Sequence, residues 1–165
     1  MSDWVVELYQ QMEAEEARRK HIVATLPDEI KGFWSALQNT LRANIEKLNS
    51  YFQRKVGAIE LKVEGPSTIT IMKVGYPAYY IDICLDYPVD HEDILLPHGE
   101  IKIQGKVAFS IEDASKFPDT ILTLELGPED DLVIQANKEP IPRREALQLI
   151  SKLILVPIIR RELPT

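Results

Sequence analysis

The sequence is poor in cysteine and glycine, and each shortage excludes a kind of chemistry. Cys84 is the only cysteine, so the chain can form no internal disulfide and cannot supply the several thiolates of a structural zinc site. A single cysteine also predicts a reducing compartment, the cytoplasm. The seven glycines are dispersed. No GxGxxG or GxxxxGKS/T loop occurs, which excludes the common phosphate-binding loops.

Basic residues and long apolar runs are scarce as well. Lysine and arginine number 19 against 26 acidic residues, which gives a formal net charge of −7. Because nucleic-acid and membrane-surface binders normally carry a basic patch, we expect neither as a partner. The longest apolar run, Leu153 to Ile159, is far shorter than the roughly 20 residues that span a bilayer. We expect no secretory signal, since no basic stretch precedes an apolar run at the start of the chain.

What remains is the composition of an ordinary globular domain. Hydrophobic residues make up 45% and charged residues 27% of the chain, which are normal proportions for a folded protein. A length of 165 residues suits one domain with a core large enough to need no disulfide or metal. We therefore expect a single domain over residues 1–165.

Residues 1–26 predict an amphipathic helix that projects from the domain. Ser2 is the expected N-cap. Trp4, Leu8 and Met12 recur at four-residue spacing and form one short apolar stripe. The residues after Met12 are almost all polar, so this helix has little to bury. It is typical of a docking element for a partner or for a second copy.

Pro27 predicts a break before a second helix over residues 27–53. This second helix carries a wide apolar stripe that keeps helical period, which places it in the core. The stripe consists of Ile30, Phe33, Trp34, Leu37, Leu41, Ile45, Leu48 and Phe52.

From residue 56 to residue 137 the apolar pattern changes to a period of two, which indicates about six short strands. The clearest of them places Tyr79, Ile81 and Ile83 on one face and polar side chains on the other. The connections between strands are too short for crossover helices, so the pattern favours an antiparallel meander. Gly105 takes the place of an apolar residue and predicts a bulge or bend.

A last helix is predicted over residues 142–161, with a kink or an end at Pro157. Arg143 and Arg144 lie at the positive end of its dipole, the unfavoured location for a cation. Two interpretations stay open: they face an acidic neighbour or an anionic partner, or they lie on the surface with no role. The predicted fold is therefore α+β with two layers. An antiparallel β-meander of about six strands is covered on one face by N-terminal and C-terminal helices.

The densest cluster of chemical groups lies in residues 86–100, where His91 and His98 stand among five carboxylates. Histidine and carboxylate together can ligate zinc or iron. However, Pro88 and Pro97 interrupt regular pairing and the spacing matches no known ligand pattern, so a solvated loop is the preferred interpretation. Cys84 lies between Asp82 and Asp86 on the wet side of its strand, and these carboxylates oppose thiolate formation. We predict no catalytic, cofactor-binding or metal-binding residue.

Three functions follow as hypotheses. The first is a non-enzymatic cytoplasmic interaction or adaptor module that self-associates as a homodimer through Trp4, Leu8 and Met12. The second is a small apolar ligand bound in a cavity between the sheet and the C-terminal helix. The order of elements is loosely similar to that of helix-grip lipid-binding folds, without their N-terminal strand. The third is a metal-dependent enzyme that uses the His91/His98 loop.

Overall fold

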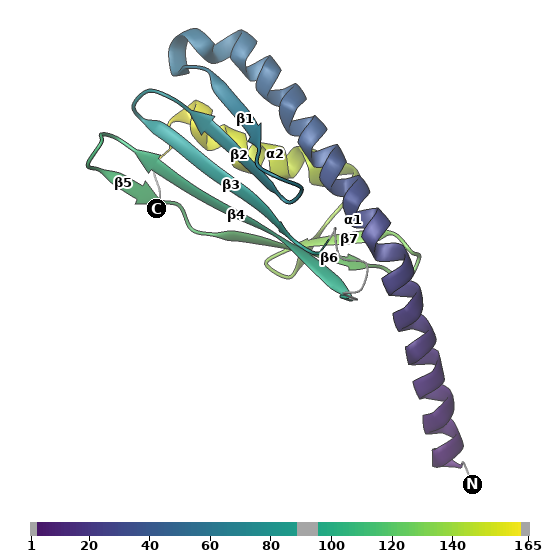
Figure 1. Ribbon diagram of the computed structural model, residues 1–165. Coiled ribbons are helices and arrows are strands. Elements are labelled where there is room, and N and C mark those ends of the chain that lie inside the picture. The colour runs from purple at the N-terminus through teal and green to yellow at the C-terminus, as the bar shows by residue number, and fades with distance from the viewer. Residues whose placement is uncertain (1–2, 89–95, 163–165) are drawn as a thin grey trace.

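The chain begins with one helix of 53 residues, α1 (Trp4–Val56). The computed structural model describes residues 3–88 and 96–162, and α1 runs through it as one continuous coil (Figure 1). Asp3, not Ser2, is the N-cap: its carboxylate accepts a hydrogen bond from the Val5 amide at 3.1 Å. Gly57 ends the helix at a φ of 101°, a conformation that favours glycine.

The predicted break at Pro27 is wrong, because Pro27 lies inside α1. A proline in a helix removes one backbone hydrogen bond and crowds the preceding turn. Leu26 and Ile30 lie on either side of it and are completely buried. Their packing holds the chain helical through a residue that would end an isolated helix.

The second layer is one antiparallel sheet of eight strands in the order β1-β2-β3-β4-β6-β7-β8, with β5 paired to β4. The α+β class, the antiparallel meander and the helices at both ends are confirmed. The strand count exceeds the expected six because β5 and β8, of three residues each, are too short to show a period. The strands are β1 (Ile59–Val63), β2 (Thr68–Lys73), β3 (Ala78–Asp86), β4 (His98–Ala108), β5 (Ala114–Lys116), β6 (Thr120–Leu126), β7 (Leu132–Ala136) and β8 (Glu139–Ile141).

A bulge lies opposite Gly105. The β4–β5 pairing ends at Lys106–Lys116 and the β4–β6 pairing begins at Ile103–Thr120. Between these pairs, two residues of β4 face three residues of the connection between β5 and β6. The Phe117 amide donates to the Gly105 carbonyl at 2.7 Å. The expected irregularity is therefore present, with its extra residue in the connection between β5 and β6 that faces Gly105.

The last element is α2 (Arg143–Arg160), which continues past Pro157 for three residues. It lies beside α1 on the same face of the sheet (Figure 1). The Asn44 amide links the two helices by donating to Gln148 Oε1 at 3.1 Å and to Ser151 Oγ at 2.8 Å. Arg143 lies 3.3 Å from the Glu29 carboxylate, which is one of the two interpretations that the sequence left open.

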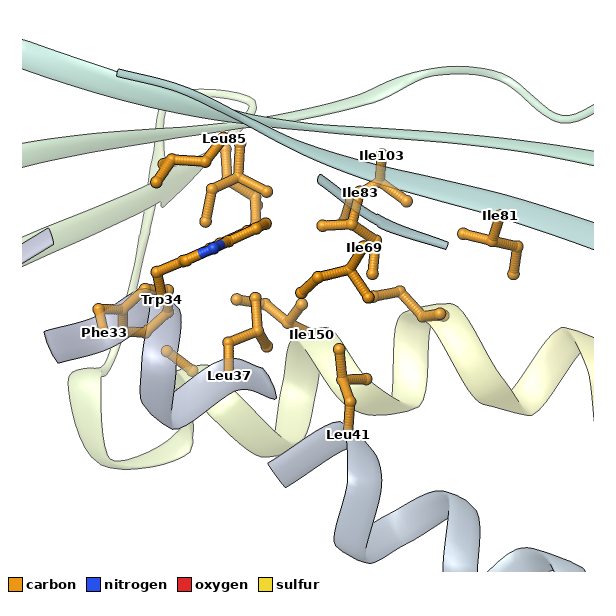
Figure 2. Packing of buried hydrophobic residues seen from close by; sticks show 14 of the residues in the cluster. Phe33, Trp34, Leu37, Leu41, Ile69, Ile81, Ile83, Leu85, Ile103 and Ile150 are labelled. Carbon is orange, nitrogen blue, oxygen red and sulfur yellow. The ribbon is translucent and has the colours of Figure 1, made fainter. Parts of the chain in front are cut away.

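The core lies between the helices and the inner face of the sheet. Ile69, Ile83 and Ile103 face one another across three neighbouring strands and are buried. Figure 2 shows them meeting Leu37 and other side chains of α1, with Ile150 of α2 beside them. Burying such a side chain stabilises the fold by roughly 1.5–3 kcal/mol, which is why the alternation in the strands decides which face meets the helices.

Candidate interaction surface

Every side chain from Trp4 to Ala17 is exposed, and we call residues 4–17 the N-terminal segment. It extends past the sheet as the free end of α1 (Figure 1). The six large apolar side chains in it have exposed fractions between 46% and 69%. They are Trp4, Val5, Val6, Leu8, Tyr9 and Met12.

Five of these six apolar side chains form one broad face. Trp4, Leu8 and Met12 make one row at four-residue spacing, and Val5 and Tyr9 make a second row beside it. Together the two rows cover an arc of roughly 140° at 3.6 residues per turn. Only the first row was predicted from the sequence. The second was detectable from the same spacing, because the stretch WVVELYQQM is apolar at six of nine positions.

The N-terminal segment is also strongly acidic. Residues 3–17 contain five carboxylates and no lysine or arginine. The Tyr9 hydroxyl donates to Glu13 at 2.6 Å, and this hydrogen bond, followed by a smaller effect of burial, raises the pKa of Tyr9. Contacts of this kind between residues four apart stiffen a helix that has no core beneath it.

The residues that directly follow the N-terminal segment in α1 contact the turn between β6 and β7. The Arg18 guanidinium lies 3.1 Å from Asp130 Oδ1 and donates to the Gly127 carbonyl at 2.8 Å. His21 Nε2 lies 2.8 Å from the same carboxylate oxygen. The hydrogen bond from His21, followed by that from Arg18, lowers the pKa of Asp130. The direction in which the segment leaves the domain follows from the continuous helix α1, and these polar contacts hold that helix to the sheet where the segment ends.

Two hollows adjoin α2. The first, which we call the α1–α2 groove, has a volume of about 420 Å³ and is formed by helix residues alone. Its apolar lining consists of Leu48, Phe52, Leu155, Val156 and Ile159, and its polar lining of Asn44, Lys47, Gln148, Ser151, Lys152 and Arg160.

The second hollow, which we call the sheet–α2 pocket, has a volume of about 250 Å³. Leu153 and Pro118 line it and are exposed, so it opens to solvent. It is almost entirely apolar, with Tyr79, Ile81, Ile103, Gly105, Phe117, Thr120, Ile154 and Pro157 as the other lining residues.

The residues considered for metal or thiol chemistry do not form a site in the part of the chain that the structure describes. His91 lies outside the described residues, and His98 is the exposed first residue of β4, paired with Glu125. In residues 3–88 and 96–162, no three histidine, cysteine or acidic side chains lie close enough to hold a metal ion. Cys84 is half-buried on the outer face of β3, between the exposed side chains of Asp82 and Asp86.

One buried charge was missed from the sequence. Lys73 is 4% exposed, and its ammonium group donates to the Pro77 carbonyl at 2.7 Å and to the Gly75 carbonyl at 3.2 Å. Desolvation, followed by the charge of Arg161, lowers the pKa of Lys73. Lys73 continues the buried row of Ile69 and Ile71, where the period of two predicts an apolar residue. Its partners are carbonyls of the turn between β2 and β3, so its role is structural.

Comparison of the chain with models of known protein families, with curated proteins and with solved structures found no significant match. Within residues 3–88 and 96–162, neither helix carries a stretch that is both long and apolar enough to cross a bilayer.

Proposed function

We propose that this chain is a non-enzymatic interaction module that self-associates through its N-terminal segment. The observation that carries the proposal is the exposure of six large apolar side chains on one helical segment of the chain. Contiguous exposed apolar surface of this kind marks interaction sites in folded proteins. An amphipathic helix that presents its apolar face to a groove or to another helix is a common way of binding.

The energetics support a partner for this face. Covering a large apolar side chain contributes up to roughly 1.5–3 kcal/mol, and Trp4, Leu8 and Met12 lie in one row where a single partner covers them together. The segment is already helical, as the continuation of a helix that packs in the core. Little conformational entropy is therefore lost on binding, which favours affinity. A homodimer is the simplest closed assembly. The single cysteine favours the cytoplasm as its compartment.

Sedimentation equilibrium of the full chain tests the proposal. We expect the wild type to self-associate at micromolar concentrations and the Trp4→Ala/Leu8→Ala/Met12→Ala variant to be monomeric with unchanged helix content. Ile111→Ala is the matched control, because Ile111 is 92% exposed and lies outside the N-terminal segment. It removes exposed apolar surface without touching that segment and should associate like the wild type. A wild type that stays monomeric contradicts the proposal.

The sheet–α2 pocket favours a second function, binding of a small apolar molecule. Its volume of about 250 Å³ exceeds the ~150 Å³ of an apolar cavity that binds benzene. Gly105 lines it, and a Cβ built there meets Phe117 at 3.4 Å, which is an ordinary contact. The position therefore has room for a Cβ, and we expect Gly105→Val to fold and to occupy part of the pocket. Loss of benzene binding, detected by ligand-observed NMR, supports this function, and equal binding by wild type and variant contradicts it.

A further inference from the structure

The α1–α2 groove combines an apolar floor with a basic rim. Lys47 from α1 and Lys152 and Arg160 from α2 line it, and no acidic side chain does. Arg160 reaches a carboxylate, Glu162, only at 3.9 Å and in solvent, where ion pairs are weak. The groove is thus matched to an occupant that is apolar in the middle and acidic around it.

The N-terminal segment has that chemistry. Its two apolar rows are continued, four residues on, by acidic side chains: Glu16 follows Met12 and Glu13 follows Tyr9. A helix that docks by its apolar face therefore brings carboxylates to the rim of the surface that receives it. A volume of about 420 Å³ lies within the roughly 300–1,000 Å³ of ordinary ligand pockets. The groove would therefore receive side chains of the helix, not the whole helix.

The same copy cannot supply this occupant. Leu8 of the segment and Leu48 of the groove are both in α1. A continuous helix holds residues forty positions apart at a separation of about 60 Å, at 1.5 Å per residue. Two complementary surfaces on one rigid element can meet only between different molecules.

We infer that the α1–α2 groove receives the N-terminal segment of a second copy of this chain. The inference rests on the proposed self-association and names the surface that accepts it. The apolar rows lie on the groove floor, and Glu13 and Glu16 lie near Lys47 and Lys152. Complementary charge of this kind steers encounter and selects the partner. Reciprocal docking fills the groove of each copy and closes the assembly as a dimer.

A charge exchange tests the inference. Lys47→Glu/Lys152→Glu makes the groove acidic, and Glu13→Lys/Glu16→Lys makes the segment basic. Each variant alone then opposes like charges, and we expect its self-association to weaken by about tenfold or more at low salt. In an equal mixture of the two, each segment meets a groove of opposite charge, and association should return. Lys31→Glu/Lys116→Glu is the control, because it makes the same change in net charge at exposed positions outside the groove.

The possible results separate the two proposals. A monomeric wild type overturns both. If the wild type associates and the groove variant behaves like the control, the groove is not the acceptor. Self-association through the N-terminal segment is then still supported. Failure of the mixture to restore association also overturns the inference. Dodecanoate, an apolar chain with one carboxylate, serves as a small-molecule probe of the groove. If the wild type binds it and the groove variant still associates but does not bind it, the groove is a small-molecule site, which again overturns the inference.

Discussion

The Arg18 guanidinium lies 3.1 Å from the Asp130 carboxylate, although 112 residues separate them in the chain. His21 reaches the same oxygen. These contacts join α1 to the turn between β6 and β7, directly after the N-terminal segment. They lie between solvent-accessible side chains, so they contribute little to the stability of the core.

Asp130→Asn should weaken the contacts that hold α1 to the turn between β6 and β7. The substitution keeps the size of the side chain but removes the charge that strengthens both hydrogen bonds. We expect faster amide hydrogen exchange near residues 14–24, with the unfolding midpoint of the core little changed. Asp113→Asn, at an exposed position in another turn, is the control and should exchange like the wild type. Unchanged exchange in Asp130→Asn would contradict a role for this pair.

The same contacts should depend on pH. The folded pKa of Asp130 is lowered, first by the hydrogen bond from His21 and then by that from Arg18. Because the folded pKa lies below the ordinary value of about 3.9, the ionised carboxylate stabilises the fold at pH values above 3.9. This stabilisation is lost as the pH falls through the folded pKa. Carboxyl-detected NMR titration should give a midpoint below the ordinary value, and Arg18→Gln/His21→Gln should raise it. A wild-type midpoint at or above the ordinary value would refute the assignment.

Asn49 protects the open edge of the sheet. Its side chain donates to the Ile59 carbonyl at 2.9 Å and accepts from the Ile59 amide at 2.8 Å, as a neighbouring strand would. Asn49→Leu leaves both backbone groups without a partner, so we expect the free energy of unfolding in urea to fall by about 1–3 kcal/mol. Asn39→Leu, at an exposed position of the same helix, should have little effect. Equal effects of the two substitutions would mean that water replaces Asn49 at the strand edge.

The sheet was predictable because its signal is local and repeated. The alternation of Tyr79, Ile81, Ile83 and Leu85 fixes which face of β3 is buried, and the tight turns fix the antiparallel order. Contacts that join distant residues could not be predicted. No rule of spacing brings Asn49 to Ile59 or Arg18 to Asp130, because these pairs form only once the helix lies on the sheet. The exposed row of Trp4, Leu8 and Met12 was found from periodicity, and its exposure follows from where the sheet ends.

The break expected at Pro27 shows why a local rule can fail, and it leads to the last prediction. The rule counts the cost of proline within a helix, about 3 kcal/mol relative to alanine, but not the packing of the flanking residues. Since Leu26 and Ile30 are buried whichever residue lies at position 27, that packing should remain in Pro27→Ala while the missing backbone hydrogen bond is regained.

We therefore expect Pro27→Ala to raise the free energy of unfolding in urea, by up to about 3 kcal/mol, and to slow amide exchange near residues 23–31. Pro97→Ala changes an exposed proline outside the helices and should leave both quantities almost unchanged. A Pro27→Ala variant that is less stable than the wild type would contradict this prediction. The contacts of the half-buried Pro27 ring would then stabilise the fold by more than the missing hydrogen bond costs. In that case the continuity of α1 would depend on the proline itself, and not only on the buried residues beside it.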